Sequence, residues 1–264
     1  FQASVDRIFP LAPKTGSKKG IIQNINFQYN VRGENRIQTT DSLFFKPEMF
    51  ENAKTGVQHS IPISTNFKLF KYFSMSASTN LNHVWSFNTV EKNYDISNQE
   101  VITVQSKEFD SYTTYNFSTS LGTTIYGMFD FGEDKKIQAI RHVMRPSVSY
   151  NINPEFNQYY DTYEVVSADG ITSEEVEYTR FEQSLFGTPG NRFSSSIGLS
   201  LSNNIEAKIR DKDSTATEPK KVFLLNSFNF STNYNVAADS LNWSPLRMTG
   251  GTQIFDNKMS VNFG

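Results

Sequence analysis

The feature that most constrains the fold of this chain is an alternation of apolar and polar side chains at every second residue. Between residues 21 and 32 the odd positions are mostly apolar, whereas most even positions are Asn, Gln or Arg. A helix would distribute such residues around its surface, but a strand sorts them onto two faces. The pattern therefore predicts strands with one apolar face and one face of Ser, Asn and Thr. It returns in the stretches 73–88, 114–125, 193–202 and 227–236.

Together with weaker stretches, the alternation predicts an all-β chain with about ten antiparallel strands. Strand ends read from a pattern are uncertain by about two to four residues. The expected strands lie near residues 1–9, 21–32, 57–69, 73–88, 112–128, 137–152, 192–209, 222–236, 246–255 and 258–264.

The composition indicates where such strands would be stable. Aromatic residues make up 14% of the chain, with 23 Phe and 12 Tyr, although the mean hydropathy is −0.48. Transmembrane barrels combine these properties, because apolar rings face lipid while Ser, Asn and Thr face the interior. We therefore expect part of a large antiparallel transmembrane β-barrel. The alternative is a soluble β-sandwich or solenoid, whose solvent faces usually carry more Lys and Glu.

Charge and apolar runs exclude other classes. The net charge of −2 and pI near 6.0 give no basic field, so nucleic acid is not an expected partner. The longest apolar run, residues 222–225, is far shorter than the roughly 20 residues of a membrane-spanning helix. The absence of cysteine excludes disulfides and thiolate metal sites within these residues.

The expected connections fall into two classes by length. Short ones lie near residues 69–73, 129–136 and 255–258, whereas long ones cover 33–56, 89–111 and 153–191. Outer-membrane barrels have short turns on the periplasmic side and long loops outside. We therefore expect the long connections to face the exterior. Because a single open sheet leaves two unpaired edges, residues 1–264 are expected to be an internal segment of the barrel, with its closing strands elsewhere.

Two passages resemble a known family. Residues 140–150 have a His-x-x-x-Pro-x-x-x-Tyr character and are followed by Asn-Pro-Glu-Phe at 153–156. Further on, Ser-Leu-Phe at 184–186 and Asn-Arg-Phe-Ser at 191–194 precede Gly-Leu-Ser at 198–200. In order and spacing these passages resemble the barrel domain of the LptD family. Residues 60–64, 67–73, 237–241 and 257–263 are similar to its Bacteroidota branch in particular.

This resemblance implies an outer-membrane translocon that inserts lipopolysaccharide or lipooligosaccharide into the outer leaflet, through the barrel lumen and a lateral gate. It implies an LptE-type plug lipoprotein, an LptA-type periplasmic bridge and outer-membrane lipids as partners. An N-terminal jellyroll would lie outside residues 1–264. The alternatives are another large outer-membrane barrel, such as a nutrient transporter or secretion pore, and less favoured, a soluble adhesin.

Enzyme activity is not expected. The sequence contains no Gly-x-Ser-x-Gly, no glycine-rich phosphate loop and no paired catalytic constellation, so no cofactor is expected either. His59, His83 and His142 are isolated from one another in the sequence, and we therefore predict no metal site from them.

An acidic stretch is a candidate cation site in a long connection. Its carboxylates would suit hard divalent cations at the cell surface, although a solvated loop is the favoured interpretation. The candidate ligands are Asp161, Glu164, Asp169, Glu174 and Glu175.

Two prolines and two arginines are further candidates. Pro62 and Pro146 lie inside expected strands, where each removes a backbone donor and predicts a bulge or a weakened seam, the bulge being favoured. Arg141 and Arg145 lie near the expected periplasmic side, where inward-facing cations would contact lipid phosphates. Anchoring at the membrane interface is the favoured alternative for such basic residues.

Overall fold

The computed structural model of the chain describes residues 1–167, 172–210, 220–254 and 258–264. Its main feature is one antiparallel sheet of eleven strands, which we call the wall. This confirms the expected all-β class. The wall strands are β1 (Gln2–Ile8), β2 (Asn26–Arg36), β3 (Lys54–Leu69), β4 (Phe73–Ser86), β7 (Asp110–Gly122), β8 (Ile125–Asp130), β9 (Ile137–Asn153), β12 (Ser194–Ile209), β13 (Lys220–Asn235), β14 (Arg247–Ile254) and β15 (Met259–Phe263).

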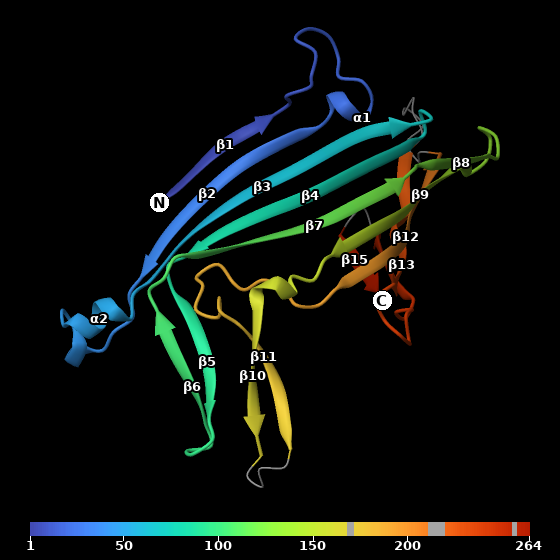
Figure 1. Cartoon of the computed structure of the whole chain (residues 1–264). Helices are drawn as coiled ribbons and strands as arrows, with labels where there is room; N and C mark the ends of the chain where they lie inside the picture. Colours follow the sequence, from blue (N-terminus) through green and yellow to red (C-terminus); the bar gives the residue numbers. More distant parts are fainter. Residues whose placement is uncertain (168–171, 211–219, 255–257) are drawn as a thin grey trace.

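The strands follow one another in the order β1-β2-β3-β4-β7-β9-β12-β13-β14-β15, with β8 also paired to β9. Figure 1 shows that the strand direction turns steadily from β1 to β15, as expected for a twisted sheet. Within the described residues, β1 and β15 each pair on one side alone, so the wall is an open sheet and not a closed barrel.

The register sorts the side chains onto two faces. Asn80 lies opposite Asn116, Ser118 opposite Asn151, and Ser147 opposite Ser200, so polar residues align across the strands. The intervening positions align apolar residues in the same way. We call these the polar face and the apolar face of the wall.

The long connections all leave the same end of the wall, as expected (Figure 1). They are not plain loops, however. Two of them contain the hairpins β5 (Thr89–Asp95) with β6 (Glu100–Ser106), and β10 (Tyr160–Val166) with β11 (Ser173–Thr179). Another contains the helical turns η1 (Asp41–Leu43) and α2 (Pro47–Glu51), and η2 (Asn157–Tyr159) precedes β10. Local alternation was too short there to predict strands.

Two expected strands differ from the structure. The stretch 21–32 begins as a strand only at Asn26, because Gly20–Gln23 form a single helical turn, α1. The stretch 112–128 is divided into β7 and β8, and residues 123–124 belong to neither strand. The short connection at 255–258 falls largely outside the described residues.

Burial is concentrated at the long-connection end. Many apolar side chains of the wall are exposed, for example Tyr115 at 52% and Val148 at 46%. In the described residues no second sheet packs on the apolar face, as a soluble β-sandwich would require. Val84, Tyr112 and Phe181 instead form a buried cluster where a long connection meets the wall.

Candidate functional site

The polar face carries paired hydroxyl and amide groups across nearly its whole width. These hydrogen bonds join neighbouring strands, so each side chain is held by the one beside it. Such a face presents many similar hydrogen-bonding groups to water or to a polar molecule. The pairs are Ser60 with Asn80, Ser76 with Ser120, Ser118 with Asn151, Ser147 with Ser200, and Ser202 with Asn229, at 2.6–3.2 Å.

Both candidate arginines lie on the polar face. Arg141 is paired across the sheet with Glu206, and its Nη2 lies 2.6 Å from Glu206 Oε2. Arg145 lies opposite Ser202, two alternations of the face further along β9. Next to the ion pair, Lys208 lies opposite Lys221, and these residues line a cleft of about 210 Å³. The described lining of this cleft therefore contains three cations, Arg141, Lys208 and Lys221, and one carboxylate, Glu206.

The ladder between β7, β8 and β9 is interrupted opposite Pro146. Gly122 pairs with Ser147 and Ile125 with Met144, so each chain advances by three residues and the register does not shift. The Thr123 amide donates to the Pro146 carbonyl at 3.2 Å. A full pair would return a bond from residue 146 to Thr123, but proline has no amide hydrogen. The division of the expected strand 112–128 follows from this missing donor.

A similar gap lies beside Pro62. Phe27 pairs with Ile63 and Asn30 with Ser60, while the two positions between them are absent from the ladder of β2 and β3. Pro62 itself remains paired with Asn80 of β4. Each candidate proline thus coincides with a two-residue gap on one side of its strand and continuous pairing on the other.

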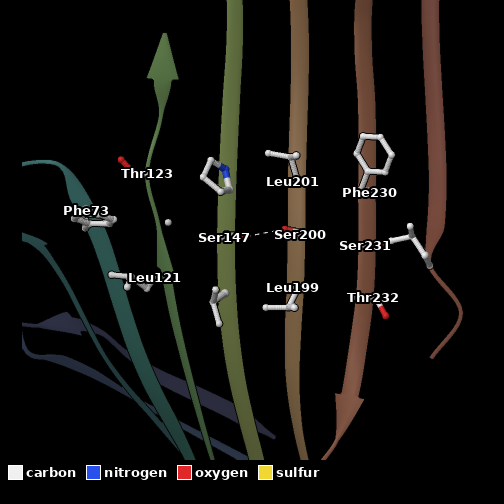
Figure 2. Close-up of a pocket in the computed structure, with 14 residues that line it drawn as sticks. Phe73, Leu121, Thr123, Ser147, Leu199, Ser200, Leu201, Phe230, Ser231 and Thr232 are labelled. Carbon is white, nitrogen blue, oxygen red and sulfur yellow. Dashed lines mark hydrogen bonds between the residues drawn. The ribbon is translucent and has the colours of Figure 1, made fainter. Parts of the chain in front are cut away.

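A groove of about 350 Å³ runs over the apolar face at the Pro146 interruption (Figure 2). Its side chains come from five neighbouring wall strands and from Leu246. Aliphatic and aromatic groups dominate the lining, as in a site that contacts hydrocarbon. Prominent among them are Phe73, Leu121, Pro146, Leu199, Leu201 and Phe230.

The structure places two histidines together that the sequence separates. His59 and His83 lie opposite each other on the apolar face, in β3 and β4. The Tyr29 hydroxyl lies 2.7 Å from His59 Nδ1, and His83 Nδ1 lies 2.8 Å from Thr113 Oγ1. The Trp85 ring packs 4.5 Å from the His59 ring. Tyr29, His59, His83 and Trp85 thus form an aromatic row near the long-connection end. With Thr113, the row crosses β2, β3, β4 and β7.

The connection after β11 folds back over the polar face at the long-connection end. We call residues 180–190 the cap. Phe181 is fully buried between Val84 and Tyr112, with its ring centroid 4.7 Å from that of Tyr112. Phe186 packs against Gly56 of β3, where a Cβ would approach its ring to 3.2 Å. Glycine at 56 therefore lets the cap lie directly on the wall.

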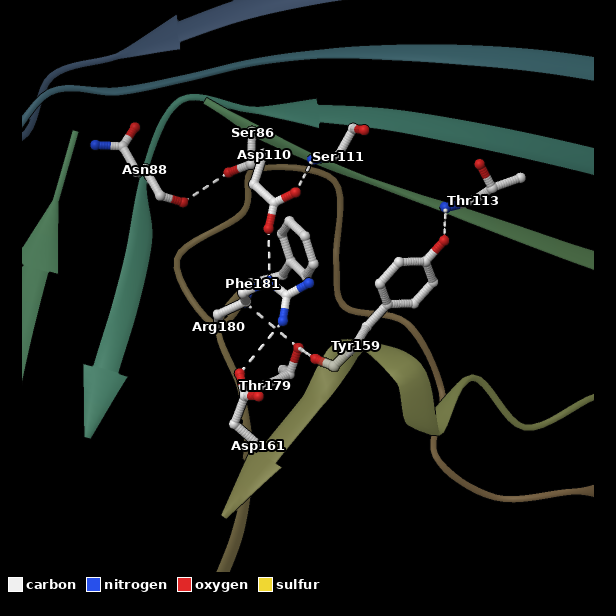
Figure 3. A network of polar contacts seen from close by, with 10 residues as sticks. All are labelled: Ser86, Asn88, Asp110, Ser111, Thr113, Tyr159, Asp161, Thr179, Arg180 and Phe181. Carbon is white, nitrogen blue, oxygen red and sulfur yellow. Dashed lines mark hydrogen bonds and ion pairs between the residues drawn. The ribbon is translucent and has the colours of Figure 1, made fainter. Parts of the chain in front are cut away.

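Polar contacts fix the cap in place (Figure 3). The Arg180 guanidinium donates to Asp110 at 2.5 Å and to Asp161 at 3.3 Å, so it connects β7, the cap and β10. Burial lowers the pKa of Arg180, but the hydrogen bond and charge of Asp110 outweigh it and the pKa is raised. The Tyr112 hydroxyl donates to the Gly187 carbonyl at 2.6 Å.

The candidate cation ligands do not converge in the described part of the chain. Asp161 pairs with Arg180, while Glu164 and Glu175 accept hydrogen bonds from Ser173 and Thr162. Glu174 lies opposite Val165. No group of three potential ligands is close enough to hold a metal ion among the residues that the structure describes. Asp169 lies outside them, and the cation site stays a prediction.

A comparison with protein families identifies the chain. The model described as "LptD protein" matches residues 1–264, the whole sequence. The chain belongs to the LptD family. This places it among outer-membrane β-barrel proteins of lipopolysaccharide transport and assembly, in agreement with the all-β wall. No curated protein and no solved structure matches the chain. Among the described residues, no helix has the length and apolar character to cross a membrane.

The two faces of the wall were predictable from the sequence, whereas the folded structure of the long connections was not. The cap left one signal, since Val84 and Tyr112 are large apolar residues at positions of β4 and β7 whose same-face neighbours are mostly Ser, Asn and Thr. The pairing of His59 with His83 left none, because it depends on the register of β3 and β4.

Proposed function

We propose that this chain forms part of the barrel wall of a lipopolysaccharide translocon. The translocon releases lipopolysaccharide or lipooligosaccharide into the outer leaflet through a lateral gate. The observation that carries the proposal is a polar face shared by many strands, back to back with an exposed apolar face, in a chain of the LptD family. The polar face would line the lumen and the apolar face would meet lipid. No covalent bond changes in this step.

The cap supports sideways rather than axial release. It lies on the polar face at the long-connection end, which faces the exterior in this proposal, and Phe181 and Arg180 fix it to the wall. A lipid moving along the polar face would meet this obstruction before it left the lumen. The row of Tyr29, His59, His83 and Trp85 would lie at a membrane interface in this proposal, since Tyr and Trp are enriched at both interfaces.

The residues singled out from the sequence have specific roles in this proposal. Arg145 contacts lipid phosphates on the polar face. Arg141 also contacts them, and its ion pair with Glu206 breaks when it does so. Pro146 and Pro62 weaken the pairing of their strands on one side. The gate itself would form where the first and last strands of the complete barrel meet.

The proposed partners follow from membership in the family. An LptE-type lipoprotein would occupy the lumen against the polar face, and an LptA-type bridge would deliver lipopolysaccharide through an N-terminal domain. We also propose that the chain belongs to the Bacteroidota branch of the LptD family.

Conditional depletion of the full-length protein tests the function. We expect lipopolysaccharide to disappear from the cell surface, measured by antibody labelling of whole cells, and to return when a second copy is expressed. A general envelope defect is controlled by labelling an unrelated outer-membrane barrel, which should remain. Normal surface lipopolysaccharide with impaired uptake of a nutrient or impaired secretion would replace the proposal with a transporter or a secretion pore.

A further inference from the structure

A second hollow lies on the polar face at the short-connection end. It has a volume of about 670 Å³ and is formed between the wall and the connection from β1 to β2. The wall contributes hydroxyl-bearing residues, including Ser74, Ser76 and Ser120. The hollow is therefore open to water and rich in hydrogen-bond donors.

Three lysines from two different segments line this hollow. Lys18 and Lys19 come from the connection, and Lys68 comes from β3. No carboxylate is among the described residues that line it. It differs in this from the cleft at Arg141, where Glu206 already neutralises one cation. Three cations without a counter-charge attract an anion.

Local contacts hold Lys68 and the end of the connection at the wall. The Thr65 hydroxyl donates to the Ile21 carbonyl at 2.9 Å, which ties the end of the connection to β3. Lys68 Nζ donates to Ser74 Oγ at 2.6 Å, and a lysine ammonium retains two further donors. Lys18 Nζ lies 2.9 Å from the centroid of the Phe9 ring, a cation–π contact within the connection.

We propose that this hollow, the lysine pocket, binds the phosphate group of an acylated lipid on the polar face. The proposal deepens the proposed function and rests on it for the identity of the lipid. Phosphate suits the pocket because its oxygens accept several hydrogen bonds at once, here from ammonium and serine donors. An unphosphorylated sugar would leave the three cations without a counter-charge in the described lining of the pocket.

Lipid binding to the full-length protein in detergent tests the lysine pocket. Native mass spectrometry would measure dissociation constants for diphosphorylated lipid A, for the same lipid after phosphatase treatment, and for phosphatidylglycerol. The variants are the double substitution K18Q/K19Q and the single substitution K68Q. K14Q is the matched control, because Lys14 lies in the same connection but does not line the pocket.

We expect K18Q/K19Q to weaken lipid A binding by about tenfold and K68Q by about threefold, as charge-assisted bonds are lost. K14Q should bind as the unchanged protein does, and phosphatase-treated lipid should bind the unchanged protein as weakly as lipid A binds K18Q/K19Q. Weakening for lipid A alone supports lipid A as the source of the phosphate. Equal weakening for phosphatidylglycerol supports a site for any phospholipid phosphate.

Unchanged binding to K18Q/K19Q, or equal weakening by K14Q, would overturn the lysine pocket. Heat-dependent migration on gels would verify that each variant forms a folded barrel. The depletion experiment is independent of this result. Normal surface lipopolysaccharide on depletion removes the proposed function, whereas impaired transport with unchanged lipid binding removes the lysine pocket alone.

Discussion

The wall and the cap are stabilised by different interactions. In the wall, backbone ladders and hydroxyl or amide pairs join the strands, and large side chains such as Tyr115 remain exposed. In the cap, Phe181 is fully enclosed and Arg180 bridges two carboxylates. The wall thus depends on register and, in the proposed barrel, on surrounding lipid, whereas the cap depends on burial of the kind found in soluble proteins.

The difference separates two tasks within one chain. In the proposed barrel, a wall without its own tightly packed core can present a continuous polar face and still be stable, because lipid would cover the other face. The cap has water on its outer side and needs a core to remain in place. Changes in the cap should therefore affect its position and leave the wall intact, and changes in the wall should do the reverse.

Replacing Phe181 by Ala should have the largest effect. Phe181 is fully buried, and such truncations cost about 3–5 kcal/mol, here from the docking of the cap. We expect protease cleavage within 180–190 to accelerate strongly while heat-dependent gel migration of the barrel persists. Phe44→Ala is the control, because Phe44 lies at the same end and is 60% exposed. Loss of the folded barrel in Phe181→Ala would show that wall and cap are not separable.

Replacing Arg180 by Gln should have the next largest effect. Its pair with Asp110 is about one-third exposed on each side, so we expect a loss of about 1 kcal/mol in cap docking. Hydrogen exchange of the Val90 amide, which donates to the Arg180 carbonyl, would report it. Arg36→Gln is the control, since Arg36 is 60% exposed and forms a loose pair. A double-mutant cycle with Asp110→Asn that gave no coupling would contradict the role of this pair.

Replacing Pro146 by Ala changes the wall instead. The new amide would donate to the Thr123 carbonyl and complete the missing pair, a gain of about 0.5–1.5 kcal/mol. We expect slower hydrogen exchange at Thr123 and Ile125, with protease sensitivity of the cap unchanged. Leu201, across from Pro146 on the continuous side, should exchange as before. Unaltered exchange at all three positions would mean that the proline does not cause the interruption.

Acidification should have a smaller effect, on the stability of the turn between β5 and β6. Backbone and side-chain hydrogen bonds from Ser97 and Asn98 lower the pKa of Asp95. A lowered folded-state pKa stabilises the turn above the ordinary value of about 4, and this stabilisation is lost as the pH falls through the folded pKa. We expect the Ser97 amide to exchange faster on acidification, after correction for intrinsic rates. Asp95→Asn should remove this dependence, and a persistent dependence would assign it to another group.

Calcium should have the smallest effect. Asp161 is already paired with Arg180, and Glu164 and Glu175 accept hydroxyl hydrogens. We expect protease protection of 160–179 in the isolated barrel to be the same with and without calcium. Protection that increases with calcium would establish the cation site predicted from the acidic stretch.

The sequence by itself determined the strands and their two faces. A period of two is a local property of an extended chain, so residues such as Phe73, Met75 and Leu81 reveal their common face without any partner. The ends of most wall strands and the grouping of the long connections follow from the same signal and from turn positions. Arg141 and Arg145 are two alternations apart, so the sequence also predicts that they share a face.

Only the tertiary structure decided what lies beside what. The pairing of His59 with His83, the gap at Thr123, the burial of Phe181 and the meeting of Lys18 with Lys68 all join residues distant in sequence. Such contacts depend on register and on how the long connections fold back. These are set by the sum of many cross-strand interactions and by loop closure, which no local pattern encodes.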